Sequence, residues 1–220
     1  MDKEKIKSIY FLAVGAFSIY PWNAILNLND FFAESFDNPD ISKIYTLGYF
    51  ILSIPAFYTT IYIDKHFSIY TSIKITFLTV LICFNLLYFV CQYLPNNLFK
   101  YVLFSFLMIM IGNCDILVGN LSTGLSSRFS GNENSYNYLG KAFSGLFCNF
   151  IMLVDLLLTR TSNNKLIYLV FLVIGDIFIA FFLFIQERVF NLMKSNQYIM
   201  KADQEDDLTG TVNRNGNRAA

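Results

Sequence analysis

Six long apolar stretches constrain this 220-residue chain more than any other feature of its sequence. They cover residues 9–28, 44–63, 73–94, 101–125, 138–158 and 166–185. A helix needs roughly 20 apolar residues to cross a hydrocarbon core of about 30 Å, and it satisfies all its backbone polar groups internally, as lipid demands. The sequence therefore predicts an all-α, polytopic membrane protein with six transmembrane helices.

The composition agrees with a chain that lies in lipid. Hydrophobic residues make up 55% and charged residues 15% of the chain, whereas soluble domains average about 45–50% and about 25%. The 16 basic and 16 acidic residues cancel, and no basic patch is large enough to follow a phosphate backbone. We therefore expect a lipid bilayer as partner and no nucleic acid. We also expect neither a cofactor nor a metal.

Two regions are expected: a six-helix bundle over residues 1–185 and a polar, disordered cytoplasmic tail over residues 186–220. With six spans both termini share one side, which then carries most cations. These are Lys3, Lys5, Lys7, Lys65, Lys74, Arg128, Arg188, Lys194, Lys201, Arg214 and Arg218. Because cytoplasmic loops are rich in Lys and Arg, we expect both termini to be cytoplasmic. We also expect a plasma membrane rather than an organelle membrane. The first stretch reaches spanning length without a small-residue cleavage site, so we expect no signal-peptide cleavage.

Polar residues inside the spans are the candidate functional residues, because an ionisable group at a helix centre costs at least about 2.5–3.5 kcal/mol against lipid. In the fourth span, polar and small residues at three- and four-residue steps share one helical face. These are Gly112, Asp115, Gly119, Ser122 and Ser126, with Asn113 and Asn120 on the neighbouring strip. Either this face lines a cavity inside the bundle or it makes a tight helix contact with hydrogen-bonded polar residues.

Lys141 and Asp176 are further ionisable residues inside the spans, and each needs a partner. Asp115 and Lys141 lie at similar depths in antiparallel spans, which suggests a buried ion pair with a lining or gating role. Asp176, near the middle of the sixth span, is expected to face the bundle as a buried partner.

The first span contains the sequence Pro21, Trp22, Asn23. A proline inside a helix removes a backbone donor, so we predict a helix break at Pro21. The break would display an aromatic plane and an amide, which suit a planar, hydrogen-bonding solute such as a nucleobase. A kinked packing helix, with Trp22 filling the bend, is the alternative.

Three motifs together resemble the equilibrative nucleoside transporters. Residues 15–23, Gly-Ala-Phe-Ser-Ile-Tyr-Pro-Trp-Asn, are followed after seven residues by Phe31 and Phe32, similar to that family's first-span signature. Residues 140–145, Gly-Lys-Ala-Phe-Ser-Gly, are similar to its fifth-span Gly-Gln-x-x-x-Gly. Residues 119–121, Gly-Asn-Leu, fall where the family has Gly-Ser-Leu.

The resemblance implies half of a major-facilitator-like bundle that carries nucleosides or nucleobases down their gradient, with Trp22 at the substrate site. We predict that Trp22, Asn23, Asn113, Asp115 and Asn120 contact the solute. The chain departs from the family at Val118 and Lys141, where members often carry Gln, and in lacking a second bundle. A truncated or half-length form, a homodimer, a partner-dependent subunit and a non-transporting six-span module therefore stay open.

An enzymatic activity is not expected. The single histidine, His66, stands in a turn beside Asp64 and Lys65, outside the spans. An intramembrane aspartyl protease would need a Gly-x-Gly-Asp context, but Val173 occupies the place of the first glycine before Asp176.

Overall fold

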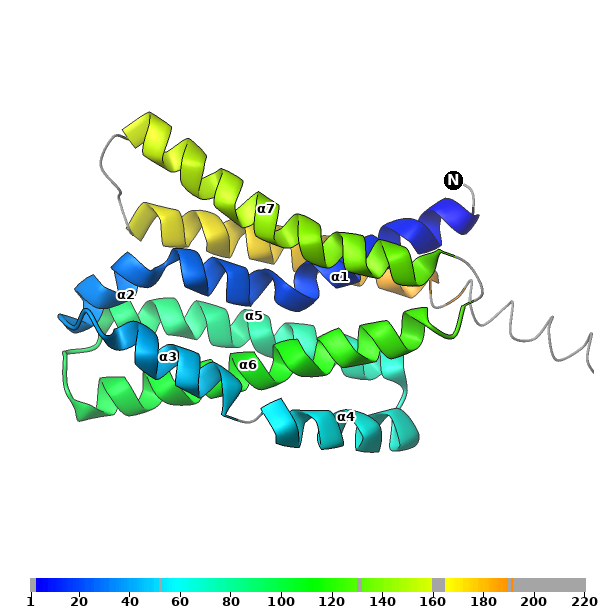
Figure 1. Ribbon diagram of the computed structural model, residues 1–220, viewed down its shortest axis with the longest axis horizontal. Helices are drawn as coiled ribbons and strands as arrows, with labels where there is room; N and C mark the ends of the chain where they lie inside the picture. Colours follow the sequence, from blue (N-terminus) through cyan, green and yellow to red (C-terminus); the bar gives the residue numbers. More distant parts are fainter. Residues whose placement is uncertain (1–2, 52, 130–131, 160–164, 190, 192–220) are drawn as a thin grey trace, which may run out of the picture.

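The computed structural model describes residues 3–51, 53–129, 132–159, 165–189 and 191, and within them it contains helices and no strand. The labelled helices are α1 (Lys3–Asn27), α2 (Asn29–Phe36), α3 (Ile41–Phe50), α4 (Ser53–His66), α5 (Ile69–Tyr93), α6 (Leu98–Ser126) and α7 (Glu133–Thr159). A further helix, Lys165–Val189, carries no label in Figure 1, where it runs from yellow to orange. We refer to it as the sixth span.

Six segments are long and apolar enough to cross a membrane. They are Glu4–Asn27, Ile41–His66, Ile69–Tyr93, Leu98–Ser126, Glu133–Leu157 and Lys165–Val189. Each contains one of the predicted apolar stretches almost entirely, and the helices extend a few polar residues beyond most of the predicted ends. The chain is thus an all-α, multi-pass membrane bundle, as the sequence predicts.

The segment between the first two predicted spans is largely helical. It contains the short helix α2 and the start of α3. Phe31, Phe32 and Phe36 of α2 are buried and pack against rings from neighbouring helices. Helix α2 ends at Asp37, whose left-handed φ of 49° turns the chain. Burial of these three aromatic side chains therefore makes part of this connector helical.

The predicted boundary between bundle and tail also shifts. The sixth span continues to Val189, past residue 185, and ends with Gln186 donating to the Tyr70 carbonyl oxygen of α5 at 2.6 Å. Residues 192–220 of the predicted tail lie outside the described residues.

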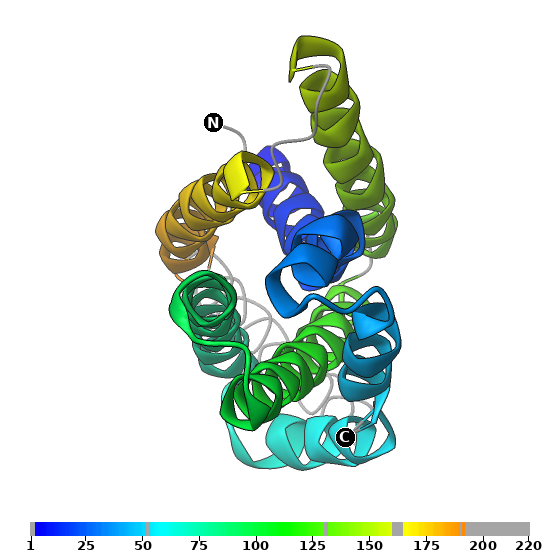
Figure 2. The same cartoon turned by 90° about the vertical axis from the view of Figure 1, so that its left-hand side faces the viewer.

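Helix α6 is the central element of the bundle, since it packs against α1, α3, α4, α5 and α7. Seen end-on in Figure 2, α1 lies between α7 and the sixth span, and α5 lies beside α6. The closest approach is between α1 and α7. A Cβ atom at Gly15 would overlap the Asn137 carbonyl, and one at Gly140 would overlap the Leu12 carbonyl. Glycines thus set the position of α7 against α1.

The helix break predicted at Pro21 is wrong: α1 runs through Pro21 as one helix. Proline is tolerated in membrane helices when neighbouring helices hold the chain, and Pro21 is buried against them. The second span is the one that divides, into α3 and α4, and Figure 1 shows the change of direction between them. Pro55 stands in the first turn of α4, where its missing N–H costs nothing and its ring prevents continuation from α3.

Both the start of α1 and the end of the sixth span lie at one end of the bundle, together with the ends of α4 and α6 (Figure 1). We call this the inner end. At the opposite end α7 leans away from the other helices, and Leu153, Leu156 and Leu157 on it are exposed.

Candidate functional site

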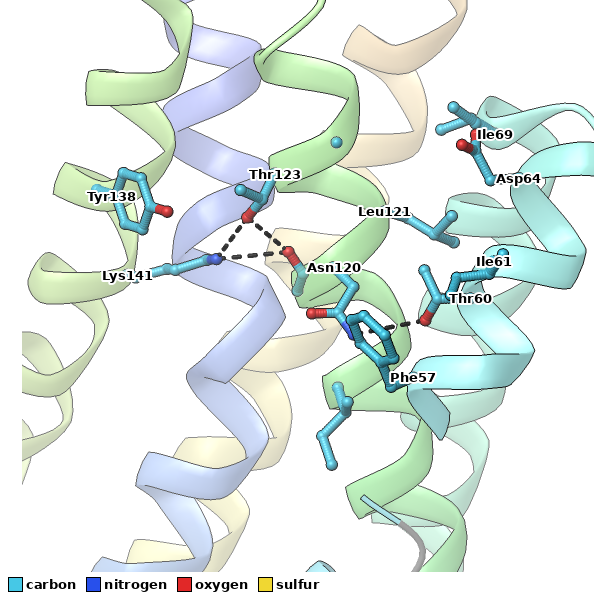
Figure 3. A pocket seen from close by; sticks show the side chains of 13 residues that line it. Phe57, Thr60, Ile61, Asp64, Ile69, Asn120, Leu121, Thr123, Tyr138 and Lys141 are labelled. Atoms are coloured by element: carbon cyan, nitrogen blue, oxygen red, sulfur yellow. Dashed lines mark hydrogen bonds between the residues drawn. The ribbon is translucent and has the colours of Figure 1, made fainter. Parts of the chain in front are cut away.

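A pocket of about 550 Å³ lies between α4, α6 and α7 (Figure 3). It lies toward the inner end of the bundle, because Asp64 and Gly124 in its lining stand near the ends of α4 and α6. Its lining combines aromatic, aliphatic and polar side chains from these three helices and the start of α5. The lining residues are Phe57, Thr60, Ile61, Asp64, Ile69, Ile116, Gly119, Asn120, Leu121, Thr123, Gly124, Tyr138 and Lys141. A volume of this size is within the range of small-molecule sites, about 300–1,000 Å³.

Lys141 reaches across the pocket from α7 to α6, as Figure 3 shows. Its Nζ donates to Thr123 Oγ1 at 3.0 Å and to the Gly119 carbonyl oxygen at 3.4 Å. The side chain is half-buried and stands eight residues after the start of α7, about 12 Å along the helix. It is therefore directed into the bundle instead of extending to the nearer helix end.

Asn120 faces α4 on the opposite side of the pocket. Its Nδ2 lies 3.5 Å from Thr60 Oγ1, a long hydrogen bond. At the inner rim, Asp64 of α4 accepts two hydrogen bonds from Arg128, at 2.6 and 2.8 Å. The pair joins the end of α4 to the segment after α6, and both side chains are largely exposed.

The ring of Trp22 does not line this pocket; it packs against α3. Its ring centroid lies 3.9 Å from that of Tyr49, with the planes tilted by 31°. Tyr45 and Phe50 approach it edge-on, with centroids 6.4 and 5.4 Å away. The indole remains half-buried, so part of its surface is open.

Asp115 is buried against the same aromatic cluster, with 4% of its surface exposed. The Tyr49 hydroxyl donates to Asp115 Oδ2 at 2.8 Å, and the Trp22 backbone also interacts with this carboxyl group. One turn earlier on α6, a Cβ atom at Gly112 would overlap the backbone of Tyr49. Residues 112–115 of α6 thus form a tight contact with α3. We call these four residues the sealed segment.

The predicted Asp115–Lys141 ion pair is absent from the described structure. Asp115 points to Tyr49 on α3, whereas Lys141 binds residues four and eight positions further along α6. These positions are about 6 and 12 Å from Asp115 along the helix axis. The sequence placed Asp115 and Lys141 at similar depths in the membrane, but this estimate is correct only to within about two helical turns. The two charged groups of an ion pair must lie closer together than that.

The other two asparagines that the sequence predicted as solute contacts, Asn23 and Asn113, make hydrogen bonds within the bundle. Asn23 Nδ2 donates to Ser144 Oγ of α7 at 3.2 Å, which joins α1 and α7 one turn outward from Lys141. Asn113 Nδ2 donates to the Ile109 carbonyl oxygen of its own helix at 3.0 Å. Neither amide lines the pocket.

Asp176 is exposed, so its prediction as a buried partner is wrong. Its Oδ1 accepts a hydrogen bond from Asn85 Nδ2 of α5 at 3.3 Å. The two polar side chains meet at the outer seam between α5 and the sixth span. A neighbouring polar group on the outer surface replaces the interior partner that the sequence interpretation assumed.

The polar face of α6 therefore divides into two parts. Residues 112–115 are the sealed segment. We call residues 119–123 the open segment, because Gly119, Asn120, Leu121 and Thr123 line the pocket, although Ser122 is buried. A Cβ atom at Gly119 would meet no atom within 4 Å. The cavity and the tight contact that the sequence left open are both present, one above the other.

The sequence interpretation missed Thr123 of the open segment and three residues on other helices that lie beside the two segments: Thr60, Tyr138 and Tyr49. Tyr138 had a detectable signal, because it stands one turn before Lys141, and Thr123 because it follows Gly119 by one turn. Thr60 and Tyr49 carried none, since the division of the second span sets the direction of both.

The pocket offers an ammonium group, amide and hydroxyl groups, and the faces of aromatic rings, which together suit binding of a planar polar molecule. No protein-family model and no curated protein matches this sequence.

Proposed function

We propose that this protein is a facilitative transporter of nucleosides or nucleobases, with the pocket between α4, α6 and α7 as part of the solute path. The observation that carries the proposal is a 550 Å³ pocket in which aromatic rings stand beside polar groups, between three membrane-spanning helices. Polar side chains gathered at membrane depth are expensive against lipid and are typical of a solute path.

The roles within the pocket follow from its chemistry. Tyr138 and Phe57 offer exposed ring faces on which a base can stack. Asn120 and Lys141 offer hydrogen-bond donors on opposite sides. Trp22 and Asn23, beside the sealed segment, would shape the outward continuation of the path. The resemblance of residues 15–23 and 140–145 to the nucleoside transporter motifs supports the same solute class.

The proposed orientation has both termini in the cytoplasm of a plasma-membrane protein, because cations gather at the inner end. The pocket would then lie toward the cytoplasmic side. Thiol-reactive probes applied to sealed vesicles of known orientation, against cysteines introduced at Lys5 and Asn96, test this arrangement. The two ends of the bundle should be labelled from opposite sides.

A second candidate, a partner-dependent subunit, is favoured by the one-sided lining of the pocket. Its walls come from α4, α6 and α7 of a single bundle, and the exposed apolar side chains of Phe57 and Ile61 line it. Alternating access in this type of fold involves two bundles that rock around a midplane site. A second copy of this chain or another bundle would supply the facing wall; without one, the chain would be a non-transporting module.

Uptake of radiolabelled uridine and adenine into proteoliposomes that contain the purified chain tests the proposal. We expect saturable uptake that stops when the gradient is dissipated. Asn120→Ala should raise the half-saturation concentration by about threefold to tenfold, since it removes one hydrogen bond. The matched control is Asn85→Ala, which removes a span asparagine outside the pocket.

Equal effects of the two asparagine variants would contradict the pocket assignment. Uptake no faster than in empty liposomes would contradict autonomous transport. In that case, uptake that appears only in cross-linked dimers would favour the partner-dependent subunit.

A further inference from the structure

The positive charge of Lys141 has no acidic partner among the described residues. Its Nζ contacts a hydroxyl oxygen, a carbonyl oxygen and, at 5.3 Å from the ring centroid, the face of Tyr138. These groups are all neutral. The ion pairs of the described residues join Lys7 to Glu4, Lys43 to Asp40 and Arg128 to Asp64.

The acidic residue of the pocket lining does not compensate this charge. Asp64 is the carboxylate among the lining residues, and both of its oxygens accept hydrogen bonds from Arg128. Arg128 thus balances Asp64 and Lys141 remains in excess. The described lining therefore carries one uncompensated positive charge.

Donors and space beside Lys141 are available to a ligand. An ammonium group has three N–H donors, and two are used by Thr123 and Gly119. The Asn120 amide has a second N–H beyond the one directed at Thr60. Next to these groups, the Cβ direction of Gly119 is empty to 4 Å. The open space at the Cβ position of Gly119 leaves room for a ligand atom in this part of the pocket.

We propose that the solute of this pocket is a planar ring compound with an anionic group, a carboxylate or a phosphate, that binds Lys141. The ring lies against Tyr138 and Phe57, and the anionic oxygens accept from Lys141 and Asn120. This inference rests on the proposed function, because it takes the pocket as the solute site. It changes the expected class from neutral nucleosides to their acidic relatives.

The alternative use of Lys141 is purely structural, as a bridge from α7 to α6. A neutral donor such as glutamine could make the same two hydrogen bonds without placing a charge among membrane helices. The cost of that charge is recovered only when an anion is bound, because hydrogen bonds between charged partners are the stronger ones.

The test uses matched pairs of neutral and anionic ligands. Binding of uracil, uracil-6-carboxylate, uridine and uridine 5′-monophosphate is measured by isothermal titration on the full chain in nanodiscs. We expect at least one anionic ligand to bind about tenfold more tightly than its neutral parent, and this preference to weaken with salt. The two pairs distinguish a carboxylate from a phosphate.

Variants then assign the preference to Lys141. Lys141→Gln should abolish it, and Lys141→Arg should keep it because the charge remains. Lys74→Gln removes a cation from the exposed face of α5, outside this pocket, and should leave the preference unchanged. The ligand comparison on the wild-type chain needs no variant, so it stands even if Lys141→Gln does not fold.

Neutral ligands that bind as tightly as their anionic relatives would overturn this inference and leave the proposed function standing. An anionic preference that survives Lys141→Gln would also overturn it. If none of the four ligands binds, both the inference and the proposed function fail.

Discussion

The two segments of α6 use similar residues in opposite ways. In the sealed segment, Gly112 lets the backbone of Tyr49 approach, and Asp115 is closed off by the Tyr49 hydroxyl. In the open segment, Gly119 faces empty space, and Thr123 accepts a hydrogen bond from a lysine in a pocket. The difference comes from the helix that faces each segment. Helix α3 packs on the sealed segment, whereas α4, which changes direction near Pro55, lies beside the open segment further along α6. Small and polar residues on a membrane helix therefore do not by themselves distinguish a contact from a cavity.

The largest difference is expected between two glycine substitutions. Gly112→Ala forces the Tyr49 backbone to move, and overpacking of this kind costs about 1–3 kcal/mol. The Cβ atom of Gly119→Ala meets no atom within 4 Å. This variant should be more stable than the wild type by less than about 1 kcal/mol, because alanine has a higher helix propensity than glycine. The melting temperature of each variant in nanodiscs provides the comparison. Equal losses would show that residue 119 is as tightly packed as residue 112.

The next effect is a difference in coupling. Tyr49→Phe and Asp115→Asn remove the two ends of one buried hydrogen bond, so their double-mutant cycle should give a coupling of about 0.5–3 kcal/mol. Asp115→Asn and Lys141→Gln act on separate segments and should add within about 0.5 kcal/mol. Equilibrium unfolding in a denaturant gradient measures both cycles. Strong coupling in the second cycle would restore the ion pair that the structure lacks.

Substitution of Trp22 tests whether the proposed solute path extends past the open segment. Trp22→Leu should weaken uridine uptake by about tenfold, since stacking on a base contributes on the order of 1–3 kcal/mol. Tyr88→Leu is the matched control, because Tyr88 is also a half-buried aromatic residue but packs against Phe31 and Tyr168. Equal loss of uptake in the two variants would mean that Trp22 only packs the bundle.

The smallest effect is expected at Asp176. Asp176→Asn keeps an acceptor for Asn85 at the exposed seam and should change stability by no more than about 0.5 kcal/mol. Asp115→Asn, at a buried position, should change it by more. The two melting temperatures, measured under one condition, settle the order. A larger loss at Asp176 would indicate that this carboxylate is covered by a partner in the membrane.

The spans were predictable because lipid places one simple demand on the sequence: about 20 apolar residues in a helix. The helix α2 was not predictable, because the burial of Phe31 and Phe32 depends on rings such as Phe104 and Tyr168 that are distant in sequence. The break in the second span and the continuity of α1 depend on how neighbouring helices pack around Pro55 and Pro21.

The candidate site was predictable in its residue types but not in its pairing. Asn120 and Lys141 do line a common pocket. Their partners depend on the offset of α7 along α6, which the contacts of Gly15 on α1 and Gly140 on α7 determine. A hydropathy pattern does not specify this offset to better than one helical turn. It also does not specify how a helix is rotated about its own axis. For the same reason, the outward direction of Asp176 toward Asn85 could not be read from its apolar neighbours.

The most direct test of the account is the reactivity of single cysteines in the two segments of α6. One variant keeps the native, buried Cys114 alone; the other carries Thr123→Cys after replacement of Cys83, Cys91, Cys114 and Cys148 by serine or alanine. A charged, membrane-impermeant thiosulfonate reacts only where water reaches the thiol, and detergent-permeabilised vesicles expose both ends of the bundle. The account predicts rapid labelling at position 123 and none at Cys114 before unfolding. Equal labelling of both cysteines, or labelling of Cys114 alone, would contradict it.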